Sequence, residues 1–146
     1  MGCSDEFIKA DYPSRWIADQ TEFIRAQLAA ARNFGHMPTR IVVLGISEGG
    51  DIVPIVSQRI SGATHAVIVA NGGMNPLDAY RIQASKHNIE VAFDILAGLK
   101  KLPMQDLNAQ TNIEAESNYI GGRSRRYWTE LHQLAHTENL LSLEIP

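Results

Sequence analysis

Two short apolar runs, each rich in β-branched residues, constrain the fold of this chain more than any other feature of its sequence. They lie at residues 40–44 and 65–70. Neither run alternates between apolar and polar residues, which is typical of strands buried on both faces of a parallel sheet. A strand, a helix and a second strand within about 30 residues form a right-handed βαβ unit. The two runs and the segment between them therefore predict an α/β fold with parallel strands.

The segment that follows the first run is rich in glycine. Its sequence is Gly45-Ile46-Ser47-Glu48-Gly49-Gly50. Glycine favours tight turns because it has no side chain to clash with the bent backbone. We expect a turn over 45–50 and a helix over 51–60, which Gly62 ends. Pro54 removes one amide donor from that helix and is expected to loosen its first turns.

The rest of the chain shows helical patterns. Residues 14–34 carry an apolar stripe at three- and four-residue spacing, whose Trp and Phe side chains we expect in the core. Its members are Trp16, Ile17, Phe23, Ile24, Leu28 and Ala31. Further helices are expected at 77–87, 89–99, 106–117 and 124–135. Because a pair of parallel strands is not expected to be stable alone, we interpret the chain as a segment of a larger fold. Its α/β core spans 1–76, and a helical segment spans 77–146.

The composition excludes several classes of protein. A net charge of −3 provides no positive field to attract nucleic acid or anionic lipid. The apolar runs are too short to span a membrane, and the first residues lack the basic and apolar regions of a signal peptide. Cys3 is the only cysteine, so a disulfide framework and a cysteine-based zinc site are excluded. We expect a cytoplasmic protein with no metal, no cofactor, and no nucleic-acid or membrane partner.

The pattern Gly45-x-Ser47-x-Gly49 lies between the first predicted strand and the helix that follows it. The two glycines are expected to relieve the clashes of a tight turn that forces Ser47 into strained backbone angles. Such a turn lifts the serine hydroxyl clear of the sheet, where a histidine base can reach it. The backbone amide of Glu48 then lies at the helix N-terminus and can donate to an oxyanion. The context of strand, turn and helix predicts a nucleophile elbow.

Two alternatives compete with this interpretation. A plain glycine-rich turn with an incidental serine would produce the same string of residues. A phosphate cradle for NAD or ATP is the other alternative, but a dinucleotide fingerprint needs glycine at the position of Ser47 and an acid after the second strand. That strand ends at Ala70 and Asn71, and no lysine of the Walker type follows the turn.

Residues 40–80 resemble the middle of an α/β-hydrolase of the serine esterase or peptidase type. The resemblance rests on the stretch from Ile41 to Gly50 and on the later segment Asn71-Gly72-Gly73-Met74-Asn75-Pro76. It implies that Ser47 is the nucleophile, that the Glu48 amide donates to the oxyanion, and that the substrate is a small molecule with an acyl group. It also implies that 14–34 is the helix before the nucleophile strand and that 77–140 is a helical cap.

The resemblance covers only the central part of the fold of that family. Its catalytic residues follow the order serine, acid, histidine, so the resemblance implies that the acid and the histidine come after Pro146. The early strands and their part of the oxyanion hole would precede Met1. We therefore expect the activating pair to come from outside this chain and expect little turnover from the chain alone.

The histidines of the chain offer no clear replacement for the missing base. They are His36, His65, His87, His132 and His136, and we expect all of them at the surface or in the cap. His132 and His136 are expected to share one helix face, and His132 is the best substitute base because a cap helix could fold over Ser47. Glu48 and Asp51 are interpreted as charges that complement the helix dipole. The alternative function is a non-catalytic module whose copies associate through the open edges of its sheet.

Overall fold

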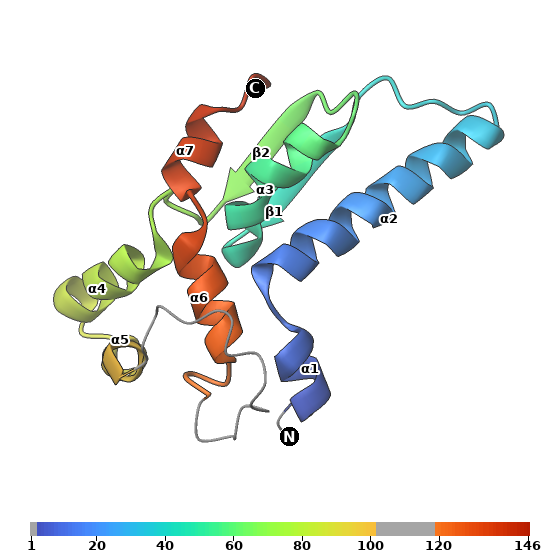
Figure 1. Ribbon diagram of the computed structural model, residues 1–146. Helices are drawn as coiled ribbons and strands as arrows, with labels where there is room; N and C mark the ends of the chain where they lie inside the picture. The colour runs from blue at the N-terminus through green and yellow to red at the C-terminus, as the bar shows by residue number, and fades with distance from the viewer. Residues whose placement is uncertain (1–2, 102–118) are drawn as a thin grey trace. The chain divides into compact units, whose positions relative to one another are not determined.

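The computed structural model describes residues 3–101 and 119–146, and it shows an α/β arrangement of helices with a small parallel sheet (Figure 1). The chain forms two compact units. One, the sheet unit, contains residues 14–74 and 135–146. The other, the helical unit, contains residues 1–13 and 75–134. The helix expected at 106–117 lies outside the described residues.

The sheet unit is built on two parallel strands, β1 (Val42–Ile46) and β2 (His65–Val69), joined by the helix α3 (Glu48–Arg59). Leu44 of β1 is in register with Val67 of β2. One face of the sheet packs against α3, where apolar side chains of both elements are buried. They are Val43, Ile52, Val53 and Val56. The predicted βαβ unit is confirmed, and Pro54 lies inside α3 without ending it.

The other face of the sheet is open in the part of the chain that the structure describes. Val42, Leu44 and Ile46 are exposed by 52%, 57% and 61%. The prediction that both runs are covered on both faces is therefore wrong for these residues. The reason is that, among the described elements, only α3 packs on the strand pair, so the side chains alternate along β1 between buried and exposed.

The long helix α2 (Pro13–Asn33) confirms the helix expected at 14–34, but not the burial of its stripe. Ile17 and Thr21 are buried, whereas Phe23 is 60% exposed. The expectation that Phe23 belongs to the core is wrong. Periodicity locates an apolar face of a helix, but it does not say whether another element covers that face.

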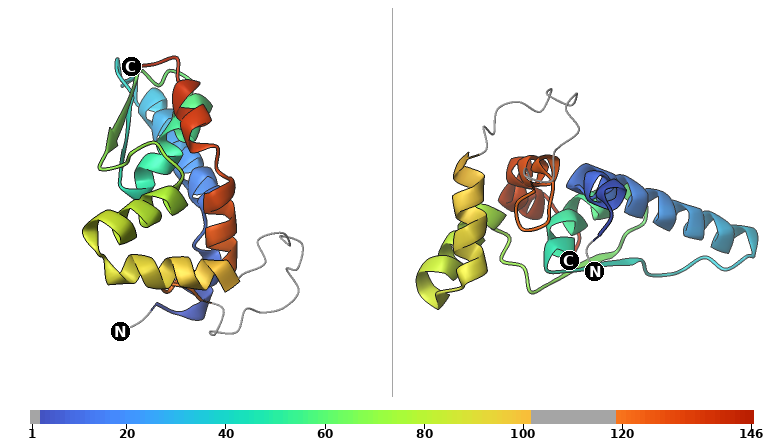
Figure 2. Two further views of the ribbon diagram at one scale, coloured as in Figure 1. Left: turned by 90° about the vertical axis from the view of Figure 1, so that its left-hand side faces the viewer. Right: turned by 90° about the horizontal axis from the view of Figure 1, so that it is seen from below.

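The last residues of the chain return to the sheet unit. The short helix α7 (His136–Leu141) packs against α3, as Figure 2 also shows. Gln58 of α3 donates to the Ser142 hydroxyl at 2.7 Å. The backbone N–H of Ala66 in β2 donates to the carbonyl oxygen of Pro146 at 2.8 Å. The outer edge of β2 is thus engaged by the end of the chain.

The helical unit contains α1 (Asp5–Ala10), α4 (Pro76–His87), α5 (Glu90–Lys101) and α6 (Arg125–Gln133). The structure confirms the helices expected at 77–87, 89–99 and 124–135, whereas α1 was not predicted. Local chemistry sets the ends of two of them: the Asn75 side chain accepts from the Leu77 N–H, and the Ser124 hydroxyl accepts from the Tyr127 N–H. Trp128 is 2% exposed and forms the centre of this unit with Tyr127 and Leu131. None of the described helices has the length and apolar character needed to cross a membrane.

Candidate functional site

Ser47 is the single residue between β1 and α3. Its φ of 55° and ψ of −122° lie in a sparsely populated region for a residue with a side chain, which costs about 1–3 kcal/mol. The predicted sequence of strand, sharp turn and helix is confirmed, and the bend is tighter than expected. We expected a turn over 45–50, but the strand continues to Ile46 and the helix begins at Glu48.

Hydrogen bonds fix the backbone of Ser47 on both sides of this strained conformation. Its N–H donates to the carbonyl oxygen of Val69 in β2 at 2.8 Å. Its own carbonyl oxygen accepts from the N–H of Gly50 at 2.9 Å and from the side-chain amide of Asn71 at 3.0 Å. A strained residue persists only when interactions with its surroundings fix its backbone conformation. These three hydrogen bonds fix the backbone of Ser47.

The two glycines of the predicted motif differ in what the fold requires of them. A Cβ at Gly45 would lie 2.3 Å from the carbonyl oxygen of Gly49 and 2.5 Å from Val53 Cγ2, so only glycine allows α3 to approach β1. A Cβ at Gly49 would meet nothing within 4 Å. The expectation that Gly49 relieves a clash is wrong, because its Cα faces open space. Gly50 has that role instead, since a Cβ there would lie 2.8 Å from Asn71 Cβ.

Ser47 is exposed, and the chain continues directly into α3. The first backbone N–H groups of a helix have no intrahelical acceptor and carry the positive end of the helix dipole. The Glu48 N–H belongs to this group because Glu48 is the first residue of α3. A hydroxyl and a helix N-terminus therefore lie next to each other at this bend. The roles of Ser47 as nucleophile and of Glu48 as oxyanion donor stay predictions.

A buried polar cluster lies directly behind the bend. The carboxylate of Asp51 accepts from the Asn71 side-chain amide at 2.8 Å, and Nδ1 of His136 lies 3.0 Å from the same carboxylate oxygen. The side chains of Asp51 and His136 are 4% and 3% exposed. A hydrogen-bonded partner is what allows such groups to be buried. The cluster joins α3, the end of β2 and the start of α7.

Two sequence expectations about this cluster are wrong. His136 is buried and belongs to neither the surface nor a cap helix, because α6 ends at Gln133 and His136 begins α7. For the same reason His132 and His136 share no helix face. Asp51 does lie in the first turn of α3, as expected for a charge near the helix dipole. No sequence signal connects it with a histidine 85 residues away.

The remaining histidines lie outside this cluster. His36, His87 and His132 are exposed, as expected. Nδ1 of His132 lies 3.3 Å from the side-chain nitrogen of Asn75, within the helical unit. His65 begins β2, and its ring nitrogen lies 3.0 Å from the Thr64 hydroxyl.

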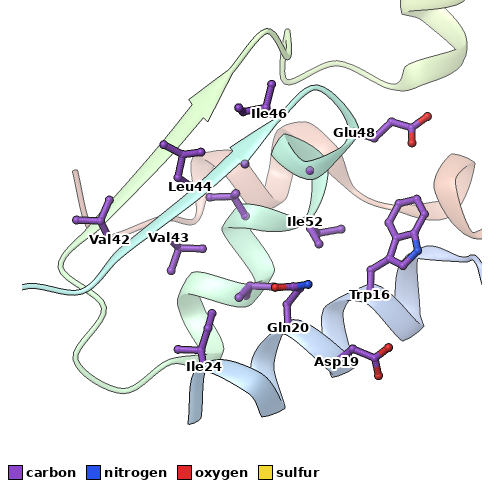
Figure 3. Close-up of a pocket in the computed structure, with 14 residues that line it drawn as sticks. Trp16, Asp19, Gln20, Ile24, Val42, Val43, Leu44, Ile46, Glu48 and Ile52 are labelled. Carbon is purple, nitrogen blue, oxygen red and sulfur yellow. The ribbon is translucent and has the colours of Figure 1, made fainter. Parts of the chain in front are cut away.

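A cavity of about 810 Å³ lies between α2 and the βαβ unit, on the side of β1 that does not pair with β2 (Figure 3). Trp16, Gln20 and Ile24 line it from α2, whereas Ile52 and Val56 line it from α3. Every residue of β1 and the first two residues of α3 also contribute to its wall. The cavity therefore reaches the bend at which Ser47 lies.

No group of three His, Cys, Asp or Glu side chains is arranged to hold a metal ion within residues 3–101 and 119–146. Comparisons of the whole chain with family models, with curated proteins and with solved structures find no match.

Proposed function

We propose that this chain is the central part of a serine hydrolase that acts on ester, thioester or amide bonds through Ser47. One observation carries the proposal: Ser47 has φ 55° and ψ −122° between a strand and a helix, and the residue is exposed. A serine that only filled a loop would gain nothing from a strained conformation, whereas a nucleophile gains exposure and a neighbouring helix N-terminus.

The proposed reaction uses the hydroxyl of Ser47 and the amide of Glu48. The Ser47 oxygen bonds to the acyl carbon while a histidine base takes the hydroxyl proton, and the Glu48 N–H donates to the carbonyl oxygen as it becomes negative. The bond to the leaving group then breaks, and that group receives the proton. Water attacks the acyl-serine in the same way and releases the acid and free Ser47.

In this proposal the base and its acid come from outside the described sheet, which contains two strands rather than the larger sheet of an α/β-hydrolase. The proposal assigns α4, α5 and α6, the helices of the helical unit that follow residue 75, to the cap segment of such an enzyme. It involves no cofactor and places the protein in the cytoplasm.

Covalent labelling by a fluorophosphonate in an imidazole buffer tests the nucleophile, because the buffer supplies the base that this proposal places outside the described sheet. We expect a phosphonyl adduct on Ser47, located by peptide mass spectrometry and absent from the Ser47→Ala variant. Ser61 is an internal control, since it is an exposed serine without a positive φ. Equal labelling of Ser47 and Ser61 would contradict the proposal. Fast turnover by the chain without added base would show instead that the base lies within it.

A second candidate function is association between two copies of the chain through the open face of the sheet. Val42, Leu44 and Ile46 expose more than half of their area, and Leu44 and Ile46 are in register with Val67 and Val69 of β2. Along both strands His65 is the only residue that can carry a charge, so two copies can meet without strong repulsion. Exposed apolar strands of this kind mark association sites.

Sedimentation velocity over a range of concentrations tests this second candidate. We expect a dimer that Leu44→Lys dissociates at least tenfold more readily. Phe34→Lys is the matched control, because Phe34 is 78% exposed but lies after the end of α2 and belongs to neither strand. A monomer at all concentrations, or an equal effect of both variants, would contradict the candidate.

A further inference from the structure

Three side chains connect the elbow at Ser47 with the start of α7. Asn71, which follows β2, donates its side-chain amide to the carbonyl oxygen of Ser47 at 3.0 Å and to the carboxylate of Asp51 at 2.8 Å. Asp51 in turn lies 3.0 Å from Nδ1 of His136. These contacts all lie within the sheet unit.

The bonds of Asn71 leave only one orientation for its amide group. Both hydrogens of the NH₂ group are used, one toward Ser47 and one toward Asp51, and the amide oxygen accepts from the Gly73 N–H at 2.9 Å. Rotation of the amide by half a turn would place its oxygen against two other acceptors and its NH₂ group against a donor. No other side chain of similar size supplies two donors and one acceptor in this arrangement.

The backbone brings Asn71 to this position through an unusual residue. Ala70, between β2 and Asn71, has a φ of 54°, which turns the chain sharply at the end of the strand. Gly50 leaves room for Asn71, because a Cβ on Gly50 would lie 2.8 Å from the Asn71 Cβ. The positive φ of Ala70 costs free energy, and the close approach of Asn71 restricts position 50 to glycine. Together these two features place the Asn71 amide next to the Ser47 carbonyl oxygen.

Asp51 and His136 hold the Asn71 side chain in place. Their side chains are 4% and 3% exposed, whereas Ser47 is an exposed residue. A histidine that is enclosed in this way and paired through Nδ1 with a carboxylate is suited to fixing that carboxylate. The start of α7 is held a second time by the Thr137 hydroxyl, which donates to the Gly73 carbonyl at 2.9 Å.

We infer that Asn71 is the positioning residue of the elbow, that Asp51 and His136 orient it, and that the place of His136 at the start of α7 therefore sets the backbone geometry of Ser47. The consequence for acyl transfer rests on the proposed function, but the geometry itself does not. His136 acts through Asp51 and Asn71 on the Ser47 backbone rather than on the hydroxyl. His136 thereby acts on a bend that lies about 90 residues earlier in sequence.

Alkylation of an introduced thiol measures the elbow geometry without any base or acyl substrate. The parent for this experiment carries Cys3→Ser and Ser47→Cys, so that the exposed Cys3 does not react. A thiol at a helix N-terminus has a lowered pKa and therefore reacts faster with iodoacetamide near neutral pH. The rate is measured from pH 5 to pH 10 in the parent and in each variant.

We expect Asn71→Ala to shift the alkylation profile toward higher pH and to slow the reaction at pH 7 by roughly three- to tenfold, as a rise of about half to one pKa unit requires. His136→Gln should shift the profile in the same direction, and its effect should nearly vanish when Asn71 is already Ala. Gln58→Ala is the matched control, because it removes another contact between α3 and the end of the chain, with Ser142. It should leave the profile unchanged.

An Asn71→Ala profile identical to that of the parent would overturn the inference, as would equal shifts from Asn71→Ala and Gln58→Ala. Circular dichroism checks that each variant is folded. If Asn71→Ala is not folded, Asn71→Ser keeps one donor and should give an intermediate profile, whereas a parental profile would again overturn the inference. Absent phosphonylation of Ser47 together with the expected thiol profiles would contradict the proposed function and leave this inference intact.

Discussion

The side-chain amide of Asn71 donates to the carbonyl oxygen of Ser47 across 3.0 Å, and this bond joins the end of β2 to the bend after β1. The Ser47 N–H meanwhile donates to Val69, the last residue of β2. Both sides of the strained serine are thus held by one neighbouring strand and the residues that follow it. The parallel pairing of β1 and β2 is therefore part of the site and not only its support.

Gly45→Ala should lower the free energy of unfolding by at least about 2–3 kcal/mol, because its Cβ would lie 2.3 Å from backbone and cannot be accommodated without moving α3. Gly49→Ala is the matched control in the same motif. Its Cβ meets nothing within 4 Å, so it should be neutral or stabilise α3 by up to about 1 kcal/mol. Urea denaturation followed by circular dichroism measures both. Equal losses would show that α3 does not approach β1 as closely as the structure shows.

Ala70→Gly should be neutral or stabilising by up to about 1 kcal/mol, although glycine normally weakens structure. Ala70 has a φ of 54°, which costs a residue with a Cβ about 1–2 kcal/mol that glycine avoids. Ala26→Gly, at an exposed position inside α2, should instead cost about 1 kcal/mol. The comparison uses thermal unfolding midpoints, and a loss at Ala70 as large as that at Ala26 would contradict the positive φ.

Asp51 and His136 should show energetic coupling in a double-mutant cycle. Each change to Ala should cost about 2 kcal/mol or more, because it leaves the other buried polar group without one partner. The double variant should cost less than the sum by about 1–3 kcal/mol. Asp51→Ala combined with Arg15→Ala should be additive, since Arg15 pairs with Asp19 at the surface of α2. Additivity in the first pair would mean that the two side chains are not in contact.

In the helical unit, Arg123→Gln should destabilise the protein more than Arg81→Gln. Arg123 pairs with Asp11, whose side chain is only 10% exposed, and its guanidinium lies 4.7 Å from the centre of the Tyr127 ring. Its loss should cost about 1–3 kcal/mol. Arg81 pairs with Asp78 at the surface, where such pairs contribute at most about 1 kcal/mol. Guanidinium chloride would screen these charges, so urea is the appropriate denaturant for this comparison.

The elements that sequence analysis predicted correctly are those that local chemistry specifies. The β-branched runs form β1 and β2, and the glycine-rich segment between them forms the bend at Ser47. In the helical unit, Ser124 caps α6 and Asn88 ends α4 in a left-handed conformation, with a φ of 49°. These signals lie within a few residues of the structure that they specify, so they can be recognised without knowledge of the fold.

The errors concern features that depend on which elements meet. Gly49 belongs to the motif but faces open space, whereas Gly50 faces Asn71. Phe23 lies on an apolar helix stripe that none of the described elements covers at that point. His136 was expected in a continuous helix with His132, but the chain breaks between Gln133 and His136 and begins α7. In each case the sequence gives the residue type, and the contact decides what the residue does.

The sequence by itself determined the strands, the helix between them and the serine at their junction, because backbone strain and side-chain shape act locally. Only the tertiary structure decided that Asn71, Asp51 and His136 gather behind that serine. The physical reason is that a buried polar group needs a partner, and the packing of α7 against α3 supplies one from 85 residues away.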